Sequence, residues 1–230
     1  MNLPSFLFIY LQFLPLRDIM SEEYIQGGGH MGEKTIYLIR HAHPALPPGV
    51  EKMCLGRKND LPLSGKGHAQ AQALAQRLAS VPLEAVYTSP LQRARQTAQA
   101  IAGDARPLHV LEDLIELDGG EWDGLTFEQL HERYPHAFGP GAKGACPPGG
   151  ESDEDGLARM LAALEYIAGR TESCAAIVAH SGVNRLLLCH LAGLAMTEKK
   201  RMGQDHAGVA VLAYRSGVWT IKEYTPRKPK

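Results

Sequence analysis

Two short apolar runs constrain the fold of this chain more than any other feature. They span residues 34–40 and 174–179, and a histidine follows each run directly, His41 and His180. Short apolar runs that are rich in β-branched residues and stop abruptly at polar ones are typical of buried strands. Ligands bind at the carboxyl ends of strands in open α/β sheets. We therefore expect the two histidines to converge on one site at the same edge of a sheet.

Strand and helix patterns alternate after Gly32, which predicts an α/β fold. Apolar stripes and capping residues predict helices over residues 64–79, 89–102, 126–134, 153–170 and 182–192. Further strands are predicted at 85–88 and 107–111, and a closing antiparallel hairpin at 207–214 and 218–224. We expect a three-layer α/β/α sandwich with a mostly parallel central sheet, built as one domain over residues 33–226.

Residues 118–157 interrupt this alternation. Glycine and proline concentrate between Phe138 and Gly150, beyond one short predicted helix. Long irregular inserts in compact domains are usually lids or binding loops. We therefore expect a small helical lid here that sets the specificity of the site.

Charge balance and cysteine spacing exclude several classes of function. The chain has 24 Lys and Arg residues against 25 Asp and Glu residues, a formal net charge of −1. This balance gives no electrostatic case for binding nucleic acid or an anionic membrane. The four cysteines, Cys54, Cys146, Cys174 and Cys189, lack a Cys-x-x-Cys pair and zinc-finger spacing, so we expect no metal and a reduced cytoplasmic protein.

The N-terminus is apolar between residues 3 and 16, but prolines interrupt it and it is too short to span a bilayer comfortably. A secretory signal would have a basic segment before the apolar one and a small-residue cleavage site after it, and this segment has neither. We interpret residues 1–32 as an extension outside the fold, with Met20 or Met31 as alternative starts. The alternative is a leader that tethers the protein to a membrane.

Chemistry-bearing residues occur in four ordered segments. These are Arg40-His41, Ser89-Pro-Leu-Gln-Arg-Ala-Arg-Gln-Thr97, Glu116-Leu-Asp-Gly-Gly-Glu-Trp-Asp-Gly124 and Ala179-His-Ser-Gly182. Together with Gly149-Gly-Glu-Ser152, they resemble the histidine phosphatase superfamily, which also contains the cofactor-dependent phosphoglycerate mutases. The resemblance covers roughly residues 34–225. It implies metal-independent hydrolysis of a phosphomonoester through a phosphohistidine, without a cofactor.

The resemblance also implies a role for each catalytic residue. His41 would be the nucleophile, kept unprotonated at one ring nitrogen by donating the other to a backbone carbonyl. Arg40 and Arg93 would bind phosphate oxygens in bidentate fashion. His180, protonated beside the phosphate, would stabilise the transferring group. Glu116 would protonate the leaving alkoxide and then activate water.

Three more positions belong to the expected binding site. The backbone amides of Ser181 and Gly182 lie at a predicted helix start, where an anion is favoured. Arg57 is either a substrate contact or an ordinary loop charge.

The chain departs from the family pattern directly after Arg40-His41. Many members have a glycine there and, a few residues later, an asparagine that helps to bind phosphate. Here Ala42-His43 follows, and no asparagine occurs before Asn59. His43 could supply the missing contact or be a rim histidine, and His206 could also face the site.

The best reading is a phosphatase acting on a small phosphorylated metabolite, with α-ribazole 5′-phosphate one candidate. A phosphoglycerate mutase is the alternative, but mutases of this family carry an Arg-His-Tyr-Gly segment in the insert, which the region after Trp122 lacks. A non-catalytic phosphate-binding module is the other alternative; it would not need an acid and a nucleophile together. The closing hairpin could be an exposed edge through which two copies form a homodimer.

Overall fold

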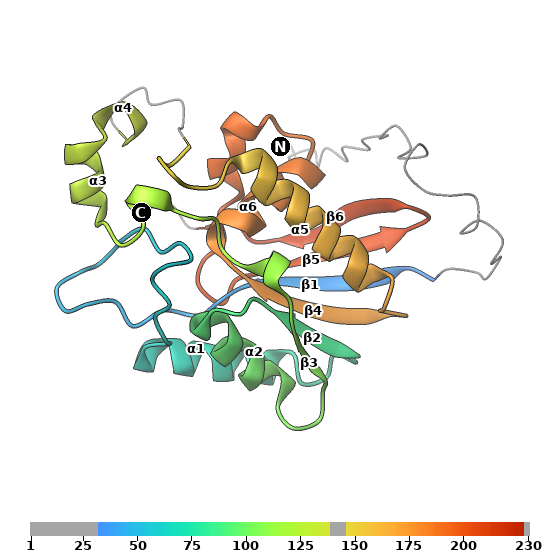
Figure 1. Cartoon of the computed structure of the whole chain (residues 1–230). Helices are drawn as coiled ribbons and strands as arrows, with labels where there is room; N and C mark the ends of the chain where they lie inside the picture. Colours follow the sequence, from blue (N-terminus) through green and yellow to red (C-terminus); the bar gives the residue numbers. More distant parts are fainter. Residues whose placement is uncertain (1–31, 139–145, 228–230) are drawn as a thin grey trace, which may run out of the picture.

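One mixed sheet forms the centre of the protein. The computed structural model describes residues 32–138 and 146–227, and its strands lie in the order β3-β2-β4-β1-β5-β6 (Figure 1). The strands are β1 (Lys34–Arg40), β2 (Ala85–Thr88), β3 (Leu108–Val110), β4 (Cys174–Ala179), β5 (Val209–Arg215) and β6 (Val218–Tyr224). Strands β1 to β4 are parallel to one another. Strand β5 pairs antiparallel with β1 on one side and with β6 on the other. This arrangement agrees with the predicted sheet and closing hairpin.

Helices cover both faces of this sheet, so the expected three-layer fold is confirmed. The long helices are α1 (Gly65–Arg77), α2 (Gln92–Ala102), α5 (Asp153–Ala168) and α6 (Ser181–Leu191). Figure 1 shows α1 and α2 on one face and α5 and α6 on the other.

Alternation along the central strands divides the core between the two faces. In β4, Ile177 packs in the cluster of α5 and α6, whereas its neighbour Val178 packs in the cluster of α1 and α2. Successive side chains of a strand point to opposite faces, and both residues are fully buried. The strand therefore has apolar side chains on both of its faces, because a layer of helices packs against each face of the sheet. Cys174 and Cys189 are buried free thiols within these clusters.

Helix α2 begins later than the sequence indicated. The predicted start was at Ser89-Pro90, but the residue that caps the helix is Leu91. Its first amide, that of Gln92, donates to Oδ1 of Asp60 over 2.6 Å. An acid from a distant loop thus caps the first amide of the helix, while the Ser89 hydroxyl accepts from the amide of Leu91 over 3.3 Å.

The insert forms short helices beside the carboxyl-terminal edge of the sheet (Figure 1). These are η3 (Gly120–Trp122), α3 (Phe127–Arg133) and α4 (Pro135–Phe138). Thr126 caps α3 in a reciprocal capping box with Gln129. The buried Trp122 ring packs against Phe138, with ring centroids 4.7 Å apart. Residues 139–145 of the predicted irregular run lie outside the described part of the chain.

The predicted N-terminal extension, residues 1–32, also lies outside the described part, except for Gly32. Within residues 32–138 and 146–227, none of the helices combines the length and apolar character required to cross a bilayer.

Helix α1 approaches the loop after β1 closely enough to need a glycine. A Cβ on Gly67 would lie 2.1 Å from the backbone oxygen of His43, whereas a Cβ on Gly65 would meet no atom within 4 Å. Ser64, the N-cap of this helix, donates its amide to the same oxygen of His43 over 3.0 Å. The start of α1 therefore supports the segment that follows Arg40-His41.

This close approach predicts opposite effects for two neighbouring substitutions. Gly67→Ala should lower the free energy of unfolding by about 1–3 kcal/mol, because backbone must move to admit the methyl group. Gly65→Ala, the matched control in the same helical turn, should leave it unchanged or raise it by up to about 1 kcal/mol. Urea unfolding of both variants tests this, and equal destabilisation would contradict it.

Candidate active site

Parallel strands bring His41 and His180 together. Strands β1 and β4 pair with Arg40 opposite Ala179, so the histidine that follows each strand emerges at the same edge. The two ring centroids are 5.1 Å apart, with 57° between the ring planes. Both side chains are buried, His41 with 4% of its surface exposed and His180 with 0%.

His41 is a neutral imidazole, and one of its ring nitrogens is held in a hydrogen bond to the backbone. Its Nδ1 lies 2.7 Å from the carbonyl oxygen of Ala42, and because a carbonyl only accepts, Nδ1 carries the proton. Burial, followed by the nearby His180, Arg40 and Arg93, lowers the pKa of His41 well below its usual value. The unprotonated Nε2 is therefore the nitrogen with a lone pair for nucleophilic attack.

His180 contacts a residue for which the sequence indicated a different role. Its Nε2 lies 2.7 Å from the hydroxyl oxygen of Ser89, and its Nδ1 is buried without a partner. Burial, then the charges of Arg93 and Arg40, lowers the pKa of His180 well below its usual value. An anion placed between these groups would favour the protonated imidazole again.

Arg93 is fully buried, and its hydrogen bonds within the described residues all go to backbone carbonyls. Its Nη1 donates to the oxygen of Asn59 over 3.0 Å, and its Nη2 donates to the oxygens of Gly56 and Leu55 over 3.1 and 3.3 Å. Asp123 in turn anchors this loop, because its carboxylate accepts from the amides of Gly56 and Lys58 and from the side-chain amide of Asn59. The side-chain amide of Asn59 therefore donates its hydrogen bond to Asp123.

Three buried nitrogen atoms of the expected site residues have no hydrogen-bond partner among the described residues. Within the described residues, neither Arg40 nor Arg93 forms an ion pair, and the Nε of each is buried without a hydrogen-bond partner. The third such atom near His41 is Nδ1 of His180. Burial lowers the pKa of Arg40 to about 10, against the opposing charge of Glu116, so this guanidinium stays charged at neutral pH. Buried polar groups normally have partners, and a bound anion would accept hydrogen bonds from these cationic groups.

Glu116 lies at the N-terminus of α6. Its Oε2 accepts from the amide of Gly182 over 2.9 Å, and its Oε1 accepts from those of Leu117 and Val183 over 2.9 and 3.2 Å. We expected the Gly182 amide to bind a substrate anion, but here it donates to the carboxyl group of Glu116, which occupies this helix start. The Ser181 hydroxyl accepts from Nη2 of Arg185 over 3.1 Å.

Two arginines and one carboxylate fix the main chain around Glu116. Arg57 donates Nε to the backbone oxygen of Glu116 over 3.0 Å, and its Nη2 lies 2.7 Å from Oε2 of Glu151. Arg159 donates Nη1 to the oxygen of Ile115 over 2.6 Å and forms an ion pair of 2.7 Å with Oε1 of Glu151. Although burial opposes ionisation, Arg159 and Arg57 lower the pKa of Glu151. The structure thus places Arg57 against the backbone of Glu116.

Glu151 also joins the two ends of the insert. The amide of Asp118 donates to Oε2 of Glu151 over 3.3 Å, and the amide of Glu151 donates to the oxygen of Asp118 over 3.0 Å. Glu151 belongs to the segment Gly149-Gly-Glu-Ser152, which the sequence offered only as a supporting match. No sequence signal paired it with Arg159.

His206 is a further residue of the site. Its ring centroid is 5.5 Å from that of His41 and 5.1 Å from that of His43. The His43 Nδ1 lies 3.0 Å from the Ser64 hydroxyl oxygen. Burial, followed by Arg40 and His43, lowers the pKa of His206 to about 2. The sequence raised His206 only as one of several histidines, because no motif surrounds it.

Metal ligation has no basis in the described part of the chain. Across residues 32–138 and 146–227, no three His, Cys, Asp or Glu side chains are grouped so that they could hold a metal ion.

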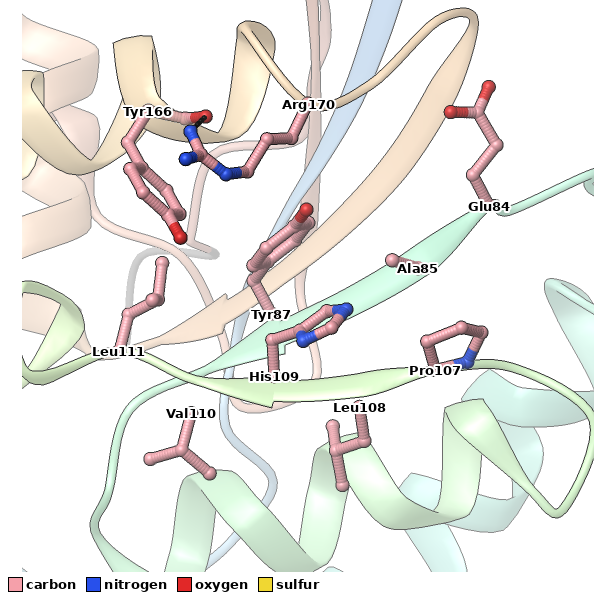
Figure 2. A pocket seen from close by; sticks show the side chains of 10 residues that line it. All are labelled: Glu84, Ala85, Tyr87, Pro107, Leu108, His109, Val110, Leu111, Tyr166 and Arg170. Atoms are coloured by element: carbon pink, nitrogen blue, oxygen red, sulfur yellow. Dashed lines mark hydrogen bonds between the residues drawn. The ribbon is translucent and has the colours of Figure 1, made fainter.

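A hollow of about 590 Å³ lies away from this constellation, between β2, β3 and the end of α5 (Figure 2). Figure 2 shows the Tyr87 and His109 rings beside each other, with centroids 5.1 Å apart, and the Arg170 guanidinium lies 3.7 Å from the centre of the Tyr166 ring. The residues that line this hollow include none of the expected site residues. The candidate site is therefore the buried cluster at the strand ends.

Burial of neutral His41 and His180 predicts a pH dependence of stability. The unfolded chain protonates histidines near pH 6.5, whereas these two remain neutral in the folded protein to a much lower pH. The unfolded state therefore binds more protons below pH 6.5. The free energy of unfolding should fall as the pH falls through this range, by up to about 1.4 kcal/mol per pH unit for each histidine.

Urea unfolding between about pH 7.5 and 5.5, one unit on either side of the histidine pKa, measures this slope. His206, with its pKa lowered to about 2, contributes to the same slope. His180→Asn should flatten the slope in part, since the variant lacks one of the three buried histidines, and His68→Asn is the control at an exposed position. The same slope in wild type and His180→Asn would show that His180 does not contribute.

Comparison with known proteins agrees with this geometry. Residues 36–226 match the model of the histidine phosphatase superfamily (branch 1). Phosphoserine phosphatase 1 of Hydrogenobacter thermophilus is 32% identical over 186 residues, which are 77% of this chain and 85% of that protein. Bacillus stearothermophilus YhfR has a TM-score of 0.76 and 29% identity, over 82% of this chain and 95% of its own. A mycobacterial glucosyl-3-phosphoglycerate phosphatase in complex with VO3 has a TM-score of 0.73 and 26% identity, over 83% and 98%. This chain therefore belongs to branch 1 of the histidine phosphatase superfamily.

Proposed function

We propose that this phosphatase hydrolyses the phosphate ester of a small metabolite through a phosphohistidine at His41, without a metal ion. The observation that supports this most is the set of unpartnered atoms on Arg40, Arg93 and His180 around a neutral His41. Phosphoryl transfer needs an aligned nucleophile and positive charge on the equatorial oxygens. The three side chains supply the charge, and His41 Nε2 supplies the lone pair.

The first step forms a phosphorus–nitrogen bond and breaks the ester bond. His41 Nε2 attacks phosphorus, the ester oxygen leaves with its electron pair, and protonated Glu116 donates a proton to it. Arg40, Arg93 and protonated His180 hold the transferring group. In the second step, Glu116 takes a proton from water as the water attacks phosphorus, and the phosphorus–nitrogen bond breaks to release inorganic phosphate and neutral His41.

Small phosphate esters are the substrate class that this proposal names. The relatives support the class through their names, which describe a phosphoserine phosphatase and a glucosyl-3-phosphoglycerate phosphatase. Phosphoserine and α-ribazole 5′-phosphate, the candidate that the family resemblance implies, are therefore the first metabolites to test. A cytoplasmic location and a homodimer that pairs through the edge strand β6 stay predictions.

Hydrolysis of p-nitrophenyl phosphate by the full chain in excess chelator tests the mechanism. Wild type should turn over and His41→Asn should lose at least about 10³-fold in kcat, as expected for a nucleophile. Acid-labile phosphate should appear on His41 during wild-type turnover. Hydrolysis that persists in His41→Asn would exclude this nucleophile. A protein that binds phosphate but never hydrolyses it would be the non-catalytic module, and transfer to an added hydroxyl compound instead of water would indicate the mutase.

The acid role of Glu116 predicts a dependence on the leaving group. Glu116→Gln should lower kcat/KM for an alkyl phosphate by about 10²–10⁴-fold, because a poor leaving group needs the proton. The loss should be much smaller for p-nitrophenyl phosphate. Gly182→Ala should reproduce this pattern, since its Cβ would lie 2.4 Å from Oε1 of Glu116 and displace the carboxylate. Equal losses for both esters would contradict the assignment.

A further inference from the structure

Arg40 is oriented entirely by uncharged acceptors. Its Nη1 donates to the backbone oxygen of Gln204 over 2.8 Å, and its Nη2 lies 2.9 Å from Nε2 of His206. Among the described residues, no carboxylate forms an ion pair with this guanidinium. Surface arginines commonly pair with acids, so an arginine held only by a carbonyl and an imidazole keeps its whole charge for another partner.

The contact with Arg40 determines the protonation of His206. A guanidinium nitrogen can only donate, so Nε2 of His206 must accept, and the single ring proton is on Nδ1. Burial, followed by the electrostatic influence of Arg40, His43, Arg227 and Lys66, lowers the pKa of His206 and favours the same neutral form. His206 is therefore an acceptor that carries no charge.

The ring of His206 and the segment around it are held in place. The ring contacts those of His41 and His43. The next residue, Ala207, has a φ of +58° and donates its amide to the oxygen of Arg40 over 3.1 Å. Non-glycine residues with positive φ store strain and persist only where the surroundings fix them.

Buried amides anchor the start of this segment. Gln204 donates Nε2 to the oxygen of Leu38 over 3.0 Å, and its Oε1 accepts from the side chain of Asn184 over 2.9 Å. Both side chains have only 1% of their surface exposed. Strand β1 and helix α6 therefore fix the backbone that presents both acceptors to Arg40.

We propose that His206 is a positioning residue, which aims Arg40 at the transferred phosphate without neutralising its charge. This rests on the proposed phosphate site. A carboxylate at the same place would also orient Arg40, but it would compete with the phosphate for the guanidinium and repel the substrate. The distinguishing property of His206 is therefore that it accepts a hydrogen bond while neutral.

Three substitutions separate orientation from charge. His206→Gln keeps a neutral hydrogen-bond acceptor. His206→Glu offers a charged acceptor of nearly the same shape as the glutamine. His206→Phe keeps a planar ring but has no acceptor. Affinity for orthovanadate and inorganic phosphate should fall about 10- to 100-fold in His206→Phe, as for loss of a hydrogen bond to a charged group. It should fall at least as far in His206→Glu. His206→Gln should remain closer to wild type than either.

If His206 has a purely structural role, the three variants should rank in a different order of vanadate affinity. If His206 only fills space, His206→Phe should be the mildest change, and the near-isosteric Gln and Glu variants should bind vanadate alike. Either result would overturn the proposal. If His206→Phe does not fold, as judged by circular dichroism, the comparison of Gln with Glu still decides.

An Arg40→Ala background distinguishes positioning from direct contact. The His206 variants should have little further effect on vanadate affinity there, because the residue they orient is absent. An undiminished effect would mean that His206 acts on the anion directly and would overturn the positioning role. Binding is measured by calorimetry without turnover, so vanadate binding by a wild-type protein that hydrolyses no ester would refute the proposed function and leave this test valid. A wild type that binds neither anion would refute both.

Discussion

The parallel pairing of β1 with β4 is the constraint on which the rest of the site depends. Arg40 lies opposite Ala179, and the amide of His41 extends the ladder by donating to the oxygen of Ala179 over 3.0 Å. The first residue beyond each strand is therefore a histidine at the same level of the same edge. A slip of one residue would turn every side chain of a strand to the opposite face. Since both faces are packed against helices, the core enforces the register and with it the contact between the histidines.

Around this pair, the protein buries two arginines that form no ion pair within the described residues. Arg93 donates to carbonyl oxygens, and Arg40 donates to a carbonyl and an imidazole. Removing unpaired ions from water costs several kcal/mol each, so these guanidinium groups lower the stability of the fold. Burial lowers the pKa of both arginines, and Glu116 offsets part of this effect, although its carboxyl group bonds to the helix start. Binding of a phosphate dianion would supply the missing charge, and it should therefore stabilise the folded state by mass action.

Local patterns in the sequence predicted the strands, most helices and the residues next to the strand ends. The strand before His180 could be predicted without knowledge of its neighbouring strands, because burial on both faces leaves a continuous apolar stretch in the sequence. The resemblance to the superfamily supplied the choice of Glu116 among several neighbouring acids. Contacts between distant segments escaped prediction: Asp60 caps α2, Ser89 contacts His180, and Glu151 reaches Arg57 and Arg159. His206 lies in no motif, because its place depends on how the segment after α6 returns over β1.

The reciprocal contacts between Asp118 and Glu151 give the insert a closed base, so residues 119–150 leave and rejoin the domain at one point. Glu151 is also the carboxylate that fixes the arginines on the backbone of Glu116 and Ile115. The support of the acid thus lies at the root of the insert. Asp123, a few residues further on, anchors the loop whose carbonyls hold Arg93. A change in the length of the insert beyond Asp123 has a small entropic cost and would leave both of these supports in place, so specificity can change there without loss of the catalytic residues.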